Sequence, residues 1–475
     1  MKKGFFLFIL YFVLAFAGKL AAHPWDPAED VIITTDGGMD DLRALTLMLA
    51  DPSVRVTAII ATDGVLTARD TWHKVKSLLA RYHHEGILVG LYHPSSAKAH
   101  GCPAARTLSW GPWLPQGATP LPADTVVARV FRYLPSQITW ISLGSLATAR
   151  HMLVHQPGFR KKVSRILWSA DGEHLQQCFN YLLDTAAYQF VRKSEVPFMI
   201  VCGPAVGTLY DPALIHALGE GNNVYAPALT DDLKHALPLH GELCDDGLYL
   251  YLADSTLFVK ESEEPLSFRL PSTAMVPARQ QILAVIRSSR PLPLLILDHL
   301  PTDTTLYRED VRPIVAAALR RYGREEWRAG LITGELHRHL GIFSIIGMKM
   351  GIRAREYFGV GPDALHVTSC AGSQPPLSCM NDGLQASTGA TPGHGLLTVT
   401  DTLPAPCARF SWLGQTVTLR LNAEIAREIF AYLRKLREQY GLESDEYWDL
   451  LREFTLRKWL ELDRHQIFKI IPDDG

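Results

Sequence analysis

Three aspartates lie in one short segment near the start of the chain, and their spacing suits a metal-binding turn. Residues 31–41 read VIITTDGGMDD, so an apolar β-branched run ends at a glycine-containing turn that carries Asp36, Asp40 and Asp41. Several carboxylates on one loop provide the hard oxygen ligands that Ca²⁺ and Mg²⁺ prefer. The alternative is an ordinary turn whose solvated acids cap the helix that follows.

The segments around this turn predict an α/β fold. From residue 31 to about residue 300, short apolar runs alternate with helical patterns, as in a mostly parallel sheet with helices on both faces. The expected strands are 31–35, 54–61, 87–91, 138–143, 163–168 and 197–201, and the expected helices include 41–50, 68–82 and 181–191. A strand-like stretch at 256–271 is expected to close one edge of the sheet. Ligands bind such sheets at the carboxyl ends of the strands, which is where the aspartates lie.

Composition limits the class of protein. The chain has 475 residues, enough for two or more domains, with 47% hydrophobic and 20% charged residues. A formal net charge of −2 gives no electrostatic argument for a nucleic-acid partner, and none is expected. The seven cysteines include no C-x-x-C pair and predict no disulfide framework, although one bridge is compatible with an oxidising compartment.

The N-terminal segment predicts export. Residues 1–3 read MKK and precede an apolar stretch at 5–17, with small residues up to Ala22 that suit cleavage. This pattern is typical of a secretory signal and is too short for a stable membrane span. We therefore expect residues 1–22 to be a signal peptide and the mature protein to be periplasmic.

The turn and the βαβ rhythm together resemble the inosine-uridine nucleoside hydrolase family. Its motif reads approximately D-T-D-x-G-x-D-D, and residues 34–41 here read TTDGGMDD, with Thr34 in place of the first aspartate. Three further blocks follow in the family's order. Residues 138–148 are similar to the strand and G-P-L-T-N turn, 179–187 to the E-F-N-x-x-x-D-P-x-A-A block, and 244–258 to the H-D-P-L-A block.

The resemblance implies a calcium-dependent hydrolase that breaks an N-glycosidic bond in a nucleoside or related ribosyl compound. The implied calcium ligands are Asp36, Asp41, Asp245 and the backbone carbonyl of Leu143. Asp36 would also take a proton from the attacking water. The implied substrate-binding residues are Asp40, Asn180 and Asp245. Asp40 would accept a hydrogen bond from a ribose hydroxyl, and Asn180 would hold the 5′ side of the ribose.

Several positions depart from the family's pattern. Residues 63–65 read DGV where the family has A-G-N, Cys178 replaces the glutamate of E-F-N, and Cys244 replaces the histidine of H-D-P. The last change removes an acid that could protonate the leaving base. Two functions stay open, hydrolysis of an N-glycoside and metal-dependent binding of a sugar or cofactor without turnover. We favour hydrolysis because the catalytic carboxylates of the family's pattern are retained better than its substrate-binding residues.

A second, smaller α+β domain is expected to begin near residue 324. The expected helices are 309–322, 342–358, 422–439 and 443–462. The last two would form either an accessory cap or an element through which two copies associate as a homo-oligomer. The predicted organisation is therefore a signal peptide at 1–22, a nucleoside-hydrolase-like domain at 23–310 and a second domain at 324–475.

Three blocks of the second domain resemble the E-type subunit family of formylmethanofuran dehydrogenase. Residues 334–341 read GELHRHLG where the family has H-G-H-L-C-P before a helix. Residues 371–385 and 387–395 are similar to its C-x-x-D-x-x-Q and T-G-C-T-x-G-K-G blocks. Two of the family's cysteines are missing and are replaced by Gly341 and Ala390.

This second domain offers ligands for a softer metal. His337, His339 and Cys379 together would suit Zn²⁺ or another transition metal. A histidine pair spaced i, i+2 on a loop needs a third ligand from elsewhere, which Cys379 would supply, with Asp382 and Gln385 lining the same pocket. The alternative is that His337 is exposed and that His339 is a hydrogen-bonded residue at a helix start.

Overall fold

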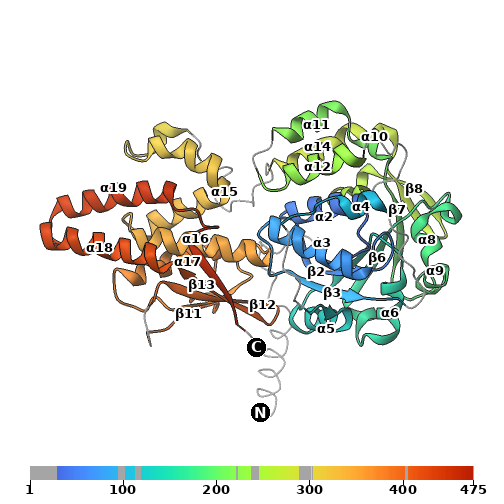
Figure 1. Ribbon diagram of the computed structural model, residues 1–475, viewed down its shortest axis with the longest axis horizontal. Helices are drawn as coiled ribbons and strands as arrows, with labels where there is room; N and C mark the ends of the chain where they lie inside the picture. Colours follow the sequence, from blue (N-terminus) through green and yellow to red (C-terminus); the bar gives the residue numbers. More distant parts are fainter. Residues whose placement is uncertain are drawn as a thin grey trace, which may run out of the picture.

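The structure is a computed structural model that describes residues 29–94, 102–112, 119–220, 223–236, 245–287, 301, 303–401 and 405–473. Figure 1 shows two parts side by side, one formed by the blue-to-green segments and the other by the orange-to-red segments. The expected signal peptide at 1–22 lies outside the described residues. Among the described residues, none of the helices has the length and apolar character needed to cross a membrane.

The first part is built on a nine-stranded sheet in the order β4-β3-β2-β1-β5-β6-β7-β9-β8. Neighbouring strands pair in parallel except for β8, which runs antiparallel to β9. The mostly parallel sheet predicted from the sequence is confirmed. The strands are β1 (Glu29–Thr35), β2 (Val54–Thr62), β3 (Leu88–Tyr92), β4 (Leu121–Pro122), β5 (Ile138–Ser142), β6 (Val163–Ser169), β7 (Phe198–Cys202), β8 (Val259–Glu263) and β9 (Leu266–Arg269).

Helices cover both faces of this sheet. Strand β1 shows why: Val31 and Ile33 belong to one hydrophobic core and Ile32 to the other, and all three are fully buried. The helices are α2 (Met39–Ala50), α3 (Ala68–Arg81), α4 (Pro103–Thr107), α5 (Ala123–Tyr133), α6 (Ala147–His155), α7 (Phe159–Lys162), α8 (Phe179–Leu183), α9 (Thr185–Val191), α10 (Val206–Leu209), α11 (Pro212–Gly219), α12 (Ala226–Ala236), α13 (Asp246–Ala253) and α14 (Met275–Ile286).

Two predicted elements differ from the structure in this part. The helix expected at 181–191 is divided into α8 and α9, because the side chain of Asp184 caps α9 by accepting a hydrogen bond from the Ala187 N–H at 2.8 Å. The stretch expected to close the sheet edge at 256–271 does so, but as the hairpin β8–β9 rather than as one strand.

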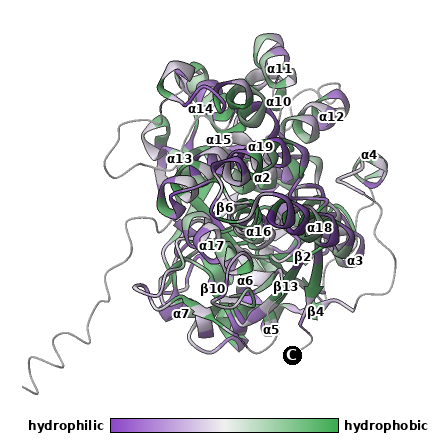
Figure 2. Ribbon diagram, turned by 90° about the vertical axis from the view of Figure 1, so that its left-hand side faces the viewer, coloured by the Kyte–Doolittle hydropathy of each residue, from purple (hydrophilic) through white to green (hydrophobic). Residues whose placement is uncertain are grey.

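The second part contains a five-stranded mixed sheet in the order β11-β10-β12-β13-β14. Its elements are α15 (Arg312–His337), α16 (Ile342–Phe358), β10 (His366–Ser369), α17 (Met380–Thr388), β11 (Leu397–Val399), β12 (Cys407–Trp412), β13 (Gln415–Leu421), α18 (Ala423–Tyr440), α19 (Asp445–Glu461) and β14 (Phe468–Pro472). Figure 2 shows the buried strand β2 of the first part in hydrophobic colours, whereas α18 of the second part carries a strongly hydrophilic face. The smaller α+β domain is confirmed.

The helix expected at 309–322 ends at the predicted residue, and a second helical segment that was not predicted follows it after a break. Helix α15 runs to His337, with one non-helical residue at Gly323, whose φ is 82°. The helix resumes after this break because Trp327 and Ala329 pack in the core between α15, α16 and α19. His337 therefore lies at the end of a helix and not on a loop as predicted.

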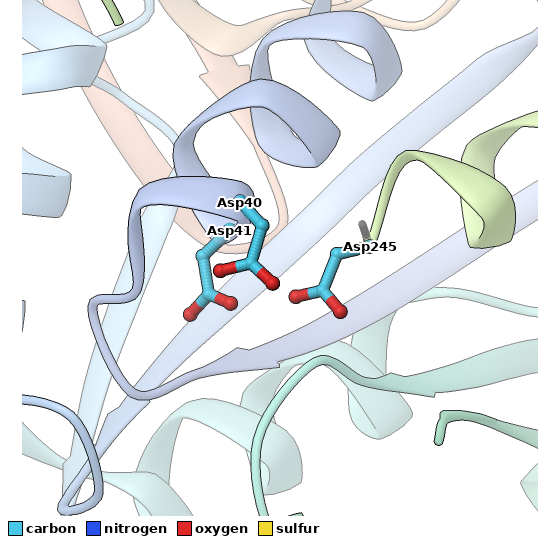
Figure 3. A group of neighbouring side chains, drawn as sticks. All are labelled: Asp40, Asp41 and Asp245. Carbon is cyan, nitrogen blue, oxygen red and sulfur yellow. The ribbon is translucent and has the colours of Figure 1, made fainter. Parts of the chain in front are cut away.

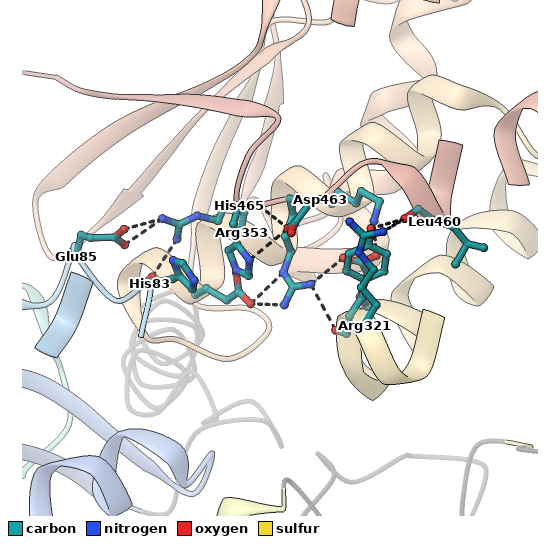
Figure 4. Close-up of polar contacts among 12 residues, drawn as sticks. His83, Glu85, Arg321, Arg353, Leu460, Asp463 and His465 are labelled. Atoms are coloured by element: carbon teal, nitrogen blue, oxygen red, sulfur yellow. Dashed lines mark hydrogen bonds and ion pairs between the residues drawn. The ribbon is translucent and has the colours of Figure 1, made fainter. Parts of the chain in front are cut away.

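A polar network joins the two parts (Figure 4). The guanidinium of Arg353 donates to both carboxylate oxygens of Glu85 at 2.9 and 3.0 Å and to the carbonyl of His83 at 2.9 Å. The rings of His83 and His465 stack with their centroids 3.8 Å apart. His84 is buried and bridges the Glu356 carbonyl and the hydroxyl of Tyr225. Helix α16 is thereby fixed against the turn between α3 and β3.

Candidate functional site

The acidic turn lies at the carboxyl end of the central strand. Strand β1 ends at Thr35 and α2 begins at Met39, so residues 36–38 form the connection. Gly37 has a φ of 86°, a left-handed conformation that favours glycine. This tight turn brings Asp36 and the first turn of α2 to the same edge of the sheet.

Hydrogen bonds fix the carboxylate of Asp41. Its Oδ2 accepts the backbone N–H groups of Asp36 and Gly37, each at 3.0 Å, and the hydroxyl of Thr35. The sequence explains this arrangement, because a side chain in the first helical turn can reach back to the backbone of the preceding turn. The orientation of one ligand is thus set locally.

Asp245 joins this turn from the other end of the domain. One carboxylate oxygen each of Asp40, Asp41 and Asp245 lie within 4.8 Å of one another, and Figure 3 shows the three side chains facing the same space. Asp41 and Asp245 are buried and Asp40 is half-buried. The hydroxyl of Ser169, at the end of β6, donates to Asp245 Oδ1. The structure therefore brings together acids about 200 residues apart in the sequence.

Asp36 lies beside these three acids, but its side-chain contacts differ from those of Asp41. Its side chain is buried, and its Oδ2 has no hydrogen-bond partner among the residues that the structure describes. A Cβ at Gly64 would lie 2.0 Å from this oxygen, and a Cβ at Gly144 would lie 2.9 Å from it. Glycine at the ends of β2 and β5 is therefore required for Asp36 to occupy this position.

The acids raise each other's pKa values. Burial, followed by the charges of Asp41 and Asp40, raises the pKa of Asp36 well above its usual range. Burial and the same two charges likewise raise the pKa of Asp245. Burial, followed by the charge of Asp41, raises the pKa of Asp40 to about 7. These four buried or half-buried acids, with an unpartnered oxygen on Asp36, fit a divalent cation. Such a cation would supply positive charge to balance the carboxylates.

The backbone carbonyl of Leu143 lies at the same sheet edge. The Leu143 N–H donates to the Thr34 carbonyl at 3.0 Å, which continues the pairing of β1 and β5. Its own carbonyl accepts the side-chain amide of Asn180 at 2.6 Å, and the same amide donates to the Ser169 carbonyl at 3.1 Å. The predicted ligand Leu143 and the predicted sugar-binding residue Asn180 are thus direct neighbours. Their roles stay predictions.

In the second part, the structure brings the two histidines together. The ring centroids of His337 and His339 are 4.1 Å apart, and His337 Nδ1 donates to Asp382 Oδ2 at 2.7 Å. His337 Nε2 is buried without a hydrogen-bond partner among the described residues. A Cβ at Gly341 would lie 3.3 Å from the Nε2 atoms of both histidines, so the two nitrogens face one small space.

Cys379 does not complete this pair in the geometry of a three-ligand site. Among the described residues, Asp40, Asp41 and Asp245 are the one set of three ligand atoms that all lie within 4.8 Å of one another. Burial, followed by the charge of Asp382, raises the pKa of the Cys379 thiol to about 11. The thiol therefore stays protonated at neutral pH unless a metal displaces the proton.

Comparison with known proteins agrees with this architecture. A family model described as "Inosine-uridine preferring nucleoside hydrolase" matches residues 31–246, and a model described as "FmdE, Molybdenum formylmethanofuran dehydrogenase operon" matches residues 336–469. The chain contains a nucleoside hydrolase domain and an FmdE domain.

Curated relatives of the hydrolase domain include the pyrimidine-specific ribonucleoside hydrolase RihA of Klebsiella pneumoniae strain 342, which is 26% identical over 193 residues. RihA of Salmonella enteritidis PT4 is 27% identical over 194 residues. Each alignment covers 36% of this chain, and the chain spans 60% of the length of these relatives.

Similar solved structures include a purine-preferring ribonucleoside hydrolase from Gardnerella vaginalis, with a TM-score of 0.44, 14% identity and coverage of 55% of this chain and 100% of that one. The plant nucleoside hydrolase PpNRh1 has a TM-score of 0.46, 16% identity and the same coverage.

The hydrolase domain also contains a buried arginine that was not predicted from the sequence. Arg43 is 2% exposed and binds Asp232 at 2.7 Å and Asp246 at 3.1 Å, while the hydroxyl of Tyr210 donates to the other oxygen of Asp246 at 2.8 Å. Arg43 lies two residues after Asp41, and Asp246 follows Asp245. The ion pair therefore ties together the two segments that carry the acids. A basic residue inside an otherwise apolar helix was the signal for it.

The positions that depart from the family's pattern have distinct surroundings. Asp63 accepts the Ala68 N–H at 2.7 Å and binds His93 Nδ1 at 3.0 Å. Cys178 is half-buried, and Cys244 lies outside the described residues. The six described cysteines are free thiols. The Asp63–His93 pair was not anticipated, because the two residues are 30 positions apart and meet only through the pairing of β2 and β3.

Proposed function

We propose that the hydrolase domain uses Ca²⁺ to hydrolyse the N-glycosidic bond of a nucleoside or related ribosyl compound. The observation that carries this proposal is the buried group formed by Asp40, Asp41 and Asp245, with the unpartnered oxygen of Asp36 beside it. The cation would be held by Asp36, Asp41, Asp245 and the Leu143 carbonyl. When bound, it supplies positive charge that orients ribose hydroxyls and makes a water molecule easier to deprotonate.

The residues of the chain account for the remaining chemistry. Asp36 accepts the proton of the attacking water, because its buried carboxylate lies beside the other acids and its Oδ2 has no partner among the described residues. Asp40 is half-buried at the opening of the group and accepts a hydrogen bond from a ribose hydroxyl. Negative charge on these side chains favours the oxocarbenium-like transition state of N-glycoside cleavage.

A second candidate function is binding of a sugar or cofactor without turnover. It is favoured by the residues at three positions that would contact the substrate, where Val65, Cys178 and Cys244 replace polar groups of the family's pattern. In that case the cation would serve capture and not bond cleavage. Calorimetry would then show calcium-dependent ligand binding with no release of base.

The experiment that separates these functions is an assay of base release from a panel of nucleosides, with EDTA and after addition of Ca²⁺. We expect activity that EDTA removes and Ca²⁺ restores. Replacement of Asp36 by asparagine should lower kcat by about 10²–10⁴-fold, the range for loss of a general base. Asp70→Asn, a change to an exposed carboxylate in the first turn of α3, is the matched control. Equal activity in Asp36→Asn and the unaltered chain would exclude hydrolysis at this site.

We further propose that residues 1–22 direct export to the periplasm. We also propose that the FmdE domain holds a transition metal through His337 and His339, whose Nε2 atoms face one small space. Cys379 would have to move toward this pair to become the third ligand that the sequence predicted. Cell fractionation with an antibody to the chain tests the location. Metal analysis of the purified chain, and of a His337→Ala/His339→Ala variant, tests the second site. An unchanged zinc content in that variant would contradict it.

A further inference from the structure

We propose that His93, oriented by Asp63, is the acid that protonates the leaving group, and that the cavity beside it receives this group. The inference rests on the hydrolase function proposed above and assigns it a residue and a binding site. Three observations carry it: a cavity at the correct edge of the sheet, an Asp–His pair on its wall, and contact of the Asp63 loop with Asp36.

The cavity lies at the carboxyl end of β3 and has a volume of about 300 Å³. Its walls come from the end of β3, the segment around β4, the first turn of α5 and the middle of α6. The lining residues are Leu91, Tyr92, His93, Pro120, Leu121, Pro122, Asp124 and His151. Strands in a sheet are about 4.8 Å apart, so β3 lies about 10 Å from β1, with β2 between them. We infer that a planar base attached to a sugar at Asp36 extends across the end of β2 toward this cavity.

Asp63 and His93 form a hydrogen-bonded pair on the wall of this cavity, and Asp63 positions the imidazole of His93. The carboxylate of Asp63 is almost fully buried, one oxygen accepting the Ala68 N–H at 2.7 Å and the other accepting His93 Nδ1–H at 3.0 Å. This contact fixes the ring orientation of His93. The side chain of His93 is 58% exposed, so Nε2 remains accessible to a ligand in the cavity.

The loop that holds Asp63 also contacts the proposed general base. Gly64 packs against the Asp36 carboxylate, and the Leu66 N–H donates to the Asp36 carbonyl at 3.0 Å. His93 is thus connected to Asp36 through one dipeptide, which places the acid at the end of β3 and the base at the end of β1, on either side of β2.

The other histidine of the cavity is engaged elsewhere. Nε2 of His151 lies 3.0 Å from both carboxylate oxygens of Asp124, and its ring lies against Tyr92 with the centroids 4.6 Å apart. This part of the wall offers aromatic surface to a planar group. His93 is therefore the better-placed proton donor of the two, and it compensates for Cys244, which cannot serve as an imidazole acid.

The step balances as a hydrolysis. The N-glycosidic bond breaks and its electron pair goes to the nitrogen of the leaving base, which receives the proton of His93 Nε2. Water forms a bond to the anomeric carbon and gives its proton to Asp36. The products are the neutral base and the free sugar, and solvent returns a proton to His93 and removes one from Asp36.

The test compares two leaving groups on the full chain. One substrate is the nucleoside that the unaltered protein cleaves fastest, and the other is 4-nitrophenyl β-D-ribofuranoside, whose phenolate departs without protonation. We expect His93→Gln to lower kcat for the nucleoside by about 10²–10³-fold and to leave hydrolysis of the nitrophenyl riboside nearly unchanged. Asp63→Asn should show the same selectivity with a smaller loss, because the imidazole remains in place without its carboxylate.

His151→Gln is the matched control, since it alters the same cavity at the histidine that is paired elsewhere. It should change KM for both substrates similarly and produce no selective loss of kcat. Equal effects of His93→Gln on the two substrates, or no effect on either, would overturn the role of His93 while leaving the hydrolase function intact. Failure of the unaltered protein to cleave either substrate would overturn the hydrolase function, and this inference with it.

Discussion

The two candidate metal sites differ in how much of the fold builds them. The acids of the hydrolase domain come from the first βα turn and from the start of α13, and the buried Arg43 pairs hold these segments together. In the FmdE domain, His337 and His339 are neighbours in sequence and already face one small space. A long-range site depends on the whole domain, whereas a local pair depends on one helix end. The comparison therefore predicts different sensitivities to mutation.

The largest expected effect is the loss of calcium affinity when Asp245, a ligand of the long-range site, loses its charge. A unit charge about 4 Å from another contributes about 4 kcal/mol at an effective dielectric constant of 20, so Asp245→Asn should lower calcium affinity by about 10³-fold. Isothermal titration calorimetry measures this affinity. Asp254→Asn, at the other end of α13, should leave it unchanged. Equal loss in both variants would mean that the helix, and not the carboxylate, is responsible.

The next effect is a loss of stability when the buried ion pairs of Arg43 with Asp232 and Asp246 are removed. Arg43→Met leaves Asp232 and Asp246 without their cation in a buried setting, which should cost about 3–5 kcal/mol of unfolding free energy. Arg279→Met is the control, because its pair with Asp211 is partly exposed and should contribute about 1 kcal/mol or less. Denaturant unfolding in EDTA measures both. Similar losses would contradict a special role for Arg43.

A smaller effect is expected at the local pair. His337→Ala should reduce bound transition metal by metal analysis, and it should leave calcium affinity of the hydrolase domain within about twofold, because sites with no shared partners act additively. A fall in calcium affinity would show that the two sites are coupled. The interface through His84 and Glu356 would then be the place to look for the coupling.

The smallest effect concerns the pH dependence of the contact between the two parts. Burial, followed by the charges of His465 and Arg353, lowers the pKa of His83 to about 4. The unfolded chain then binds more protons than the folded one between pH about 4 and about 6.5, so stability falls as pH falls through this window. His83→Asn, which tolerates the positive φ of 61°, should flatten this slope in thermal unfolding. His216→Asn, at an exposed histidine, should not.

Much of the hydrolase fold was predictable because its central strands, such as β1, β2 and β5, are short apolar runs buried on both faces. Val31–Ile33 illustrate this, since such a run has few stable alternatives in a sheet covered by helices. The break at Asp184 and the extension of α15 beyond Gly323 were missed. The first depends on a cap and the second on packing of Trp327, and neither contact is visible in a window of sequence.

The sequence by itself determined the sheet, the division into two domains and the presence of acids at the end of β1, because local periodicity and turn residues encode these features. Only the tertiary structure decided which acids meet, that Arg43 holds them together, that Cys379 stands apart from the histidine pair, and that Asp63 finds His93. These contacts join segments from 30 to about 200 residues apart. Their geometry follows from strand order and helix packing, which no local pattern specifies.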